Sequence, residues 1–242
     1  MLIVMHKESV IIDDLIKQII EKKLLPGAKL PSENELADIY DVPRITVRNA
    51  LTKLEERSYI YSVQGKGRYL KEKSIPIQLP LTGKTSFTEK MEKLGYDLNT
   101  INISCEKINF DPKIYEVLKA SEMDTVYQVG RLRLINDEPI AIHYSYVSEA
   151  NFPKIGDDGS SILSMFAYYR EQGIQQFSSR KTFLSVTFPT SKEQQLLACK
   201  SMVPLIVVES DCIDADSQSV LEHTKILYRS DKFKYDITID DL

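Results

Sequence analysis

The chain has 242 residues, of which 43% are hydrophobic and 27% charged, and its formal net charge is −4. This composition is typical of a folded globular protein and excludes collagen-like and low-complexity classes. No apolar run approaches the ~18 residues of a membrane helix, and we expect no signal peptide. Three cysteines without CxxC spacing indicate neither a disulfide framework nor a zinc site. We therefore expect a cytoplasmic protein with no metal and no cofactor.

The negative net charge conceals a basic segment. Residues 43–71 hold seven basic side chains and only two acidic ones, Glu55 and Glu56. A local excess of positive charge is typical of a surface that contacts nucleic acid. The same excess is also found on an ordinary solvated helix face, so charge by itself leaves both interpretations open.

The first part of the chain has a helical pattern. Apolar residues recur at helical spacing over residues 8–23, and Pro26 and Gly27 then indicate a turn. Ser32 and Glu35 have the spacing of a capping box, in which each side chain satisfies a free backbone N–H group at the start of a helix. A second helix is therefore predicted from this point.

A third helix and a hairpin follow. Residues 44–56 place four apolar side chains on one face, namely Val47, Ala50, Leu51 and Leu54. Residues 59–63 and 68–72 then alternate as two short strands around Gln64-Gly65-Lys66-Gly67. Residues 1–72 are thus predicted to form one unit with the order helix, helix, turn, helix, hairpin.

The remainder of the chain has a different pattern. Residues 73–81 contain Pro76 and Pro80, which disfavour helix and predict an extended linker. Residues 82–242 are predicted to form an α+β domain with a mostly antiparallel sheet. Strands are expected in five segments, at 100–110, 125–147, 177–188, 204–213 and 219–237. Helices are expected at 160–173 and 190–200.

Two helices joined by a tight turn, with basic residues at the start of the second, match the helix-turn-helix plan for reading the DNA major groove. Arg44 and Arg48 are four residues apart and share one helix face. Arginine can donate two hydrogen bonds to guanine or pair with phosphate. Thr46 is also expected to reach DNA. The hairpin would be a wing, with Gly65 and Gly67 allowing close approach of the backbone and Lys66 contacting a phosphate.

The segment PSENELADIYDVPRITVRNALTKLEERSYIYSVQGKGRYL resembles the winged helix-turn-helix of the GntR family of bacterial transcription regulators. The DNA contacts that this resemblance implies are Arg44, Thr46, Arg48, Gly65 and Lys66. Three positions depart from the usual family pattern, namely Asn34, Pro43 and Ile45, and they concern the operator sequence that is read. Pro43 has no side chain that can cap a helix, so Asp41 is expected to take that role.

Residues 78–238 are similar to the effector-binding UTRA domain of the HutC-type branch of that family, which has a chorismate-lyase-like fold. The resemblance rests on LTGKTSFTE, YQVGRLRLINDEPIAIHYSYV, DGSSIL and LEHTKILYRSDKFKY, and it extends to repressors of trehalose and amino-sugar operons. It implies a homodimer that binds a two-fold symmetric operator and a small effector.

The residues themselves also indicate an anion site. Arg131 and Arg133 are two apart on a predicted strand and point to the same side, where they need an anion. Ser160 and Ser161 are predicted to begin a helix, whose N–H groups favour phosphate or carboxylate. The other candidates are Ser86 and Phe87 in a polar loop, and Glu222 and Tyr228 on one strand face. The resemblance implies the same set of ligand contacts: Ser86, Phe87, Arg131, Arg133, Ser161, Glu222 and Tyr228.

The sequence therefore predicts a DNA-binding repressor controlled by a small anionic metabolite, such as a sugar phosphate or an amino-sugar phosphate. One alternative is an enzyme that acts on a small acid in the second domain, although no acid–base constellation stands out. His143 is interpreted as a packed residue. A second alternative is an interaction protein that binds DNA without sequence preference.

Overall fold

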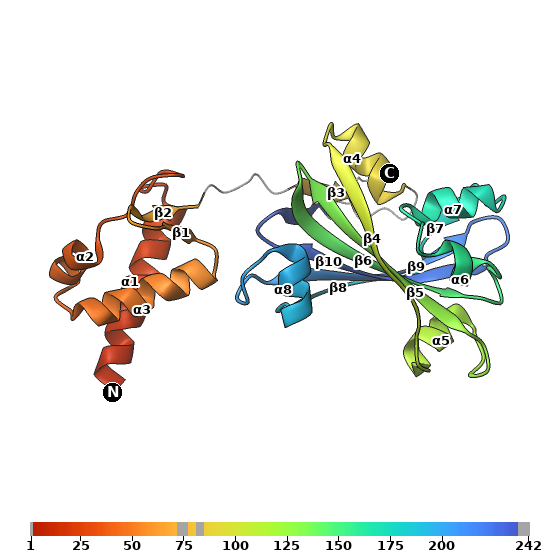
Figure 1. Cartoon of the computed structure of the whole chain (residues 1–242), viewed down its shortest axis with the longest axis horizontal. Helices are drawn as coiled ribbons and strands as arrows, with labels where there is room; N and C mark the ends of the chain where they lie inside the picture. The colour runs from red at the N-terminus through yellow and green to blue at the C-terminus, as the bar shows by residue number, and fades with distance from the viewer. Residues whose placement is uncertain (1, 72–76, 81–84, 237–242) are drawn as a thin grey trace.

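The computed structural model describes residues 2–71, 77–80 and 85–236, and Figure 1 shows them as two units. The first unit consists of three helices and a two-stranded hairpin: α1 (Leu2–Ile20), α2 (Glu33–Tyr40), α3 (Arg44–Glu56), β1 (Ile60–Val63) and β2 (Gly67–Leu70). This is the predicted order of elements. The predicted winged helix-turn-helix is therefore present.

Local sequence explains the start of α2 and the core of this unit. The Ser32 hydroxyl accepts from the Glu35 N–H, and the Glu35 carboxylate accepts from the Ser32 N–H at 2.7 Å, so the predicted capping box is confirmed. The apolar faces of the three helices meet the hairpin in one buried cluster. Its members are Ile11, Ile12, Leu15, Ile19, Leu30, Leu36, Val47, Ala50, Leu51, Leu54, Ile60 and Leu70.

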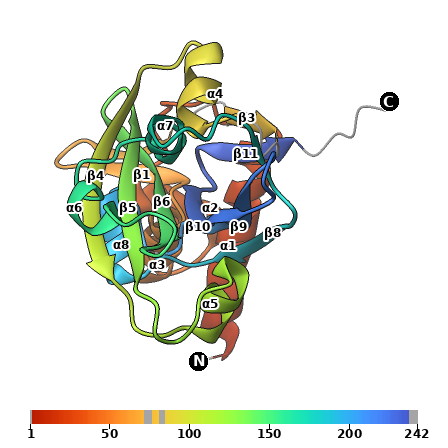
Figure 2. The same ribbon diagram turned by 90° about the vertical axis from the view of Figure 1, so that its right-hand side faces the viewer.

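The second unit is built on a seven-stranded antiparallel sheet. Its strands are β4 (Leu98–Lys107), β5 (Val126–Ile135), β6 (Glu138–Ser148), β7 (Phe177–Ser178), β8 (Thr182–Thr187), β9 (Leu205–Asp214) and β10 (Val220–Arg229). They are ordered β4-β5-β6-β10-β9-β7, with β8 also paired to β9. The single strand predicted over 177–188 is thus two edge strands, and Figure 2 shows β8 at the border of the sheet.

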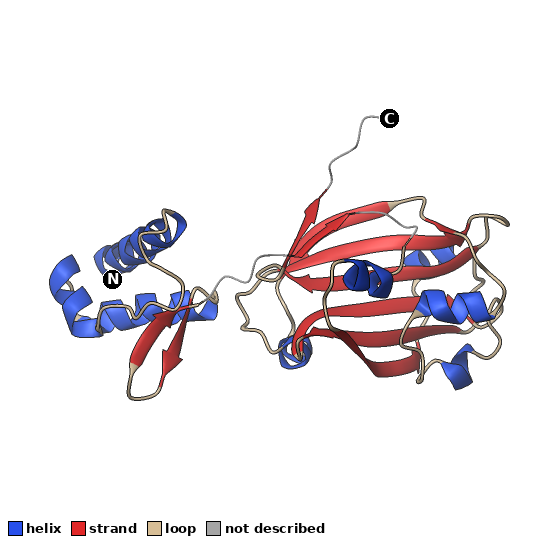
Figure 3. Ribbon diagram, turned by 90° about the horizontal axis from the view of Figure 1, so that it is seen from above, coloured by secondary structure: helices blue, strands red, loops and turns tan. Residues whose placement is uncertain are grey.

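Helices cover both faces of the sheet. On one face lie α4 (Phe87–Lys93), α6 (Ile155–Asp158) and α7 (Met165–Glu171), as Figure 3 shows. Leu118 of α5 (Pro112–Leu118) and Leu197 of α8 (Ser191–Leu197) belong to buried clusters formed with the opposite side chains of the strands. The predicted α+β class with a mostly antiparallel sheet is confirmed.

The β5–β6 hairpin contains a register shift that orients the functional side chains. Asn136 and Asp137 both have positive φ, as in a two-residue hairpin turn. A bulge between Arg133 and Leu134 then shifts the pairing, so that Arg131 lies opposite His143. A bulge inserts one extra residue into a strand and thereby changes which side chains share a face with the partner strand.

Part of the predicted linker is a strand. Residues 77–80 form β3, which pairs in parallel with β11 (Phe233–Asp236). The extended linker predicted over 73–81 thus contains four residues whose backbone pairs with a neighbouring strand. The other positions of that predicted linker, 73–76 and 81, lie outside the described residues.

Candidate DNA-binding face and effector pocket

One face of α3 is open to solvent at its first turns. The exposed side chains belong to Arg44, Ile45, Arg48, Asn49 and Thr52, whose spacing places them on one side of the helix. The opposite side is buried in the core of the unit. The structure therefore keeps both predicted arginines available on one surface.

A single carboxylate joins the basic side chains of this surface. Glu33, the first residue of α2, accepts from Arg44 Nε at 2.8 Å, from Arg48 Nη2 at 3.0 Å and from Arg68 Nη1 of β2 at 3.0 Å. Its hydrogen bond to Arg48, followed by those to the other two arginines, lowers the pKa of Glu33 from 4.5 to about 2. The recognition helix, α2 and the wing are thus connected through one ionised group.

The hairpin has the glycine geometry expected of a tight turn. Gly65 has φ +72° and Gly67 has φ +117°, both in a region that side chains disfavour. Lys66 lies between them and is exposed at the tip. A shallow cleft separates this tip from the start of α2, and Lys29, Asn34 and Arg68 are among the residues that line it.

Two expectations for the start of α3 are corrected by the structure. Thr46 is only 1% exposed, and its hydroxyl has no hydrogen-bond partner among the described residues. It faces the core and does not present a hydroxyl to DNA. Asp41 does not cap α3; it adopts the left-handed conformation that ends α2, while Pro43 occupies the N-cap position without a side-chain bond.

The second unit contains a pocket between the sheet and the helices α4 and α7. Three basic and two acidic side chains line it, namely Lys90, Arg131, Arg133, Asp211 and Glu222. Six serines line it as well: Ser86, Ser145, Ser164, Ser178, Ser179 and Ser210. The free volume of about 150 Å³ suits a small metabolite.

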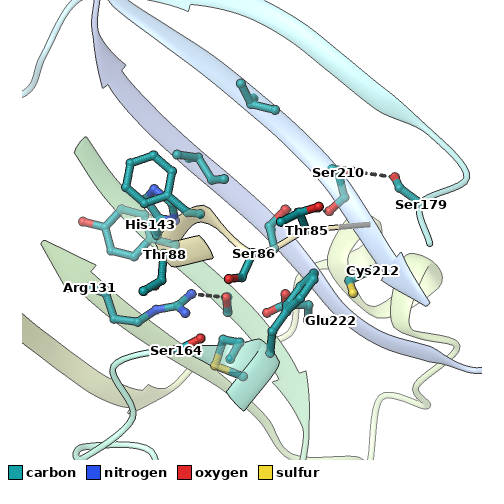
Figure 4. A pocket seen from close by; sticks show the side chains of 18 of the residues that line it. Thr85, Ser86, Thr88, Arg131, His143, Ser164, Ser179, Ser210, Cys212 and Glu222 are labelled. Atoms are coloured by element: carbon teal, nitrogen blue, oxygen red, sulfur yellow. Dashed lines mark hydrogen bonds between the residues drawn. The ribbon is translucent and has the colours of Figure 1, made fainter. Parts of the chain in front are cut away.

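The two predicted arginines are both buried in this pocket. Arg131 is 4% exposed and donates to the Ser145 hydroxyl, and Figure 4 shows its guanidinium pointing into the pocket. Arg133 is 3% exposed and donates from Nη1 to Thr100 Oγ1 at 2.6 Å. The Nε atoms of both arginines have no hydrogen-bond partner among the described residues. Such buried, unpaired donors are rare in folded proteins and indicate a place for an acceptor.

Charge in the pocket is shaped by burial. Burial first, and then the neighbouring Arg131, lowers the pKa of Arg133 to about 9, and burial also lowers the pKa of Arg131. A guanidinium group keeps its positive charge in proteins. Burial raises the pKa of the Glu222 carboxyl, an effect that the Arg131 charge opposes. Glu222 is 3% exposed, and its Oε2 has no hydrogen-bond partner among the described residues.

An aromatic wall closes one side of the pocket. The Phe87 ring lies 4.7 Å from the His143 ring and 6.0 Å from that of Tyr228, measured between centroids. The Arg133 guanidinium lies 5.6 Å from the centre of the Phe87 ring. Ser86 was expected in a loop; instead it caps α4, and Phe87 is the first residue of that helix.

The structure brings six of the seven predicted effector residues together. Ser86, Phe87, Arg131, Arg133, Glu222 and Tyr228 all line the pocket. Ser161 does not; its hydroxyl is directed to the Asp158 carbonyl in a turn after α6. The helix predicted to begin at Ser160 and Ser161 begins instead after Ser164, which caps α7 and lines the pocket.

Sequence reasoning missed several lining residues, above all His143, Lys90 and Ser145. Burial, followed by the charges of Arg133, Arg131 and Lys90, holds the pKa of His143 well below its ordinary value, so the imidazole is neutral. The alternation of β6 could have indicated that His143 and Ser145 share a face. It could not have indicated that this face meets the arginines.

Within the described ranges, no helix is long and apolar enough to span a membrane. No cluster of three His, Cys, Asp or Glu side chains that could hold a metal ion occurs among the same residues. The features that remain are an arginine-bearing recognition helix with a wing and a separate polar pocket. Together they define a DNA-binding regulator with a small-molecule site.

Comparison with known families agrees with this class. Residues 7–70 match the gntR family of bacterial regulatory proteins, and residues 93–234 match the UTRA domain. The chain therefore belongs to the gntR family, in the HutC-type branch that carries a UTRA domain.

Similar proteins are regulators of transcription. The repressor NagR of Bacillus subtilis is 26% identical over 227 residues, covering 93% of this chain and 91% of NagR. The mannosyl-D-glycerate system repressor MngR of Escherichia coli is 26% identical, covering 93% and 92%, and the regulator TreR of B. subtilis is 27% identical, covering 95% of both. The chain is accordingly a transcription regulator and not an enzyme.

The fold is shared with a solved structure. PhnF from Mycobacterium smegmatis superposes with a TM-score of 0.61 at 20% identity, covering 95% of this chain and 98% of PhnF. Its effector domain alone also superposes with a TM-score of 0.61, at 17% identity, covering 68% of this chain and all of that domain.

Proposed function

We propose that this protein is a bacterial repressor that binds a two-fold symmetric operator as a homodimer and is released from it by a small anionic metabolite. One observation carries this proposal: two buried arginines share a small pocket with unpaired donors, in a chain whose other unit displays an arginine-bearing recognition helix. Because the proposed target is DNA, we place the protein in the bacterial cytoplasm.

On the DNA side, α3 enters the major groove with its first turns. Arg44 and Arg48 donate to guanine edges or to phosphates, since both guanidiniums are accessible and face the same way. Gly65, Lys66 and Gly67 contact the sugar–phosphate backbone as a wing. Thr46 is left out of this set because it is buried.

On the effector side, the pocket selects an anion that also carries hydroxyl groups. Arg131 and Arg133 hold the negative group, because their unpaired Nε donors and positive charge are already buried and oriented. The serine hydroxyls and the free Oε2 of Glu222 supply partners for sugar hydroxyls or for an amine. Phe87 and Tyr228 pack against the ring. A sugar phosphate or an amino-sugar phosphate fits this set of partners.

The name of the relative MngR assigns it to a mannosyl-D-glycerate system. That compound combines a sugar with a carboxylate. This supports a sugar that carries an acid group as the class of effector. For the present chain we propose only the chemical groups of the ligand: an acid group that binds the arginines and hydroxyl groups that bind the serines.

The homodimer is proposed to form along β8. All six residues of this strand are exposed, its free side lies at the border of the sheet, and it carries three large apolar side chains, Phe183, Leu184 and Val186. An exposed, apolar edge strand is a site for pairing with another chain. A second copy of β8 in antiparallel pairing would cover it with two-fold symmetry.

Residues that line the pocket also contact the segment before β8, so ligand binding could change the position of this strand. Asp211 Oδ1 accepts from the backbone N–H groups of Arg180 and Lys181, at 2.8 and 3.2 Å, in the break between β7 and β8. Ser179, in the same break, forms a 2.7 Å hydrogen bond with Ser210, and both serines line the pocket. A ligand that alters these contacts would shift β8 and change the spacing of the two recognition helices.

A thermal-shift panel on the full chain tests the effector class. Glucose 6-phosphate and glucosamine 6-phosphate are compared with glucose, glucosamine and inorganic phosphate. A ligand that binds only the folded protein raises its melting temperature by mass action. We expect at least one phosphorylated sugar to stabilise the protein more than its parent sugar does. Equal shifts for charged and uncharged sugars would exclude an anion-selective pocket.

A further inference from the structure

The recognition face of α3 contains one large apolar side chain. Ile45 is 57% exposed and lies between Arg44 and Arg48, while Asn49 and Thr52 complete the polar part of this face. Residue 45 belongs to the first turn of the helix. An aliphatic side chain here lies among the residues that approach base edges when such a helix enters the major groove.

The surroundings of Ile45 hold it in a defined position. Arg44, the residue before it, and Arg48, about one turn further on, are both bonded to Glu33, so these two charged neighbours share one carboxylate. Val47 and Thr46, which follow directly, are fully buried and fix the rotation of the helix about its axis. Ile45 therefore projects outward, on the side of the helix away from the core.

The burial of Thr46 removes the other uncharged side chain of this turn from the exposed face. A threonine hydroxyl could accept or donate hydrogen bonds to several bases, but this one is directed inward. The uncharged group of the first turn that remains for DNA is the sec-butyl chain of Ile45, which can neither donate nor accept. The thymine 5-methyl is the apolar group that base pairs present in the major groove.

We propose that Ile45 recognises the 5-methyl group of a thymine in each operator half-site, next to the base pair read by Arg44 or Arg48. This inference rests on the proposed DNA-binding function and adds a specificity-determining residue to it. Contact with the methyl group buries apolar surface on both partners. Over a cytosine or adenine edge, the same side chain would remove water from an amino group without replacing the hydrogen bond.

The test begins by selecting an operator from a random duplex pool with the full-length wild-type protein. Each thymine of the selected site is then replaced by deoxyuridine, which removes the methyl group and leaves base pairing unchanged. Affinity is measured by fluorescence anisotropy for the wild type and for Ile45→Ala. The matched control is Ile39→Ala, because Ile39 is also an exposed isoleucine of the first unit but belongs to α2 instead of α3.

The wild type should lose about fourfold in affinity at one thymine of each half-site, the magnitude of burying one methyl group. Ile39→Ala should show the same loss, and Ile45→Ala should show none at that position. If the wild type and Ile45→Ala respond equally to deoxyuridine at every thymine, Ile45 does not read a methyl group.

Failure of the DNA-binding proposal and failure of the proposed role of Ile45 give different results. If no preferred site emerges from the pool, sequence-specific binding is wrong, and the role of Ile45 falls with it. The other outcome is a site to which Arg48→Ala binds more weakly than the wild type, while deoxyuridine substitution affects the wild type and Ile45→Ala equally. In that case the DNA-binding proposal stands and only the role of Ile45 is overturned.

Discussion

Arg131 and His143 lie directly opposite each other on β5 and β6, and both side chains are buried in one pocket. The imidazole is neutral because burial and the nearby arginine charges hold the pKa of His143 well below 6.5. Positive charge in this part of the pocket therefore comes from the guanidiniums. A ligand meets two permanent cations beside a polar, uncharged ring.

The first prediction concerns Arg131. Replacing Arg131 with Ala removes a buried, charged donor, and a hydrogen bond to a charged group contributes about 1.5–3 kcal/mol. We expect affinity for the stabilising sugar phosphate to fall by roughly 10- to 150-fold, which isothermal titration calorimetry measures. Arg57→Ala is the control, since Arg57 is an exposed arginine of the first unit, outside the pocket lining. Unchanged affinity in Arg131→Ala would remove this residue from the site.

The second prediction concerns the proposed dimer. Val186 is 69% exposed on β8, and replacing it with Asp places a charge on the apolar edge. Light scattering after size-exclusion chromatography should show a dimer for the wild type and a monomer-shifted equilibrium for Val186→Asp. Met123→Asp, at an apolar side chain that is 93% exposed and far from β8 in sequence, should remain dimeric. A wild-type monomer, or a dimeric Val186→Asp, would contradict pairing through this strand.

The parts of the fold that follow local rules could be predicted from the sequence. Short-range spacing determines the capping box at Ser32 and the order of elements in the first unit. It also places Arg131 and Arg133 on one face of the same strand. The position of His143 could not be predicted, because the bulge after Arg133 changes the register by one residue. Counting back from the two-residue turn would have placed His143 on the wrong face.

The misplaced residues have a common cause. Thr46 is predicted from its place at the start of a helix, Ser161 from a predicted helix start, and both from the family resemblance; these give the position along the chain but not the direction of a side chain. Thr46 lies on the α3 face that packs into the core, and Ser161 lies in the turn that precedes α7. Tertiary packing buries Thr46, whereas a local hydrogen bond to the Asp158 carbonyl orients the exposed Ser161 hydroxyl.

The third prediction is a pH dependence. The pKa of Glu33 is lowered from 4.5 to about 2 by its arginine partners, so the stabilisation that it provides is present above pH 4.5. It is lost as the pH falls from 4.5 towards 2, because the folded state then binds the proton less readily than the unfolded state. The difference in melting temperature between the wild type and Glu33→Gln, measured at pH 6, 4 and 3, should shrink as the pH falls. A difference that stays constant would exclude this linkage.

The fourth prediction concerns the wing. Gly65 has φ +72°, and a β-carbon there would meet no neighbour within 4 Å, so Gly65→Ala adds backbone strain without a clash. The cost of a non-glycine residue in this conformation is about 1–2 kcal/mol. We expect a lower melting temperature and weaker operator binding, with unchanged ligand affinity. Gly173→Ala, also at positive φ and without a close neighbour, is the control that loses stability but keeps operator binding.

The most direct measurement is the operator affinity of the full-length protein with and without the sugar phosphate that stabilises it, for the wild type, Arg131→Ala and Arg48→Ala. We predict that the ligand weakens wild-type binding by roughly 5- to 150-fold, the range of typical coupling energies. Arg131→Ala should bind the operator like the wild type and ignore the ligand at that concentration, and Arg48→Ala should bind weakly with or without it. An operator affinity that does not change with pocket occupancy, or an Arg131→Ala protein that still responds, would contradict control of DNA binding by this site.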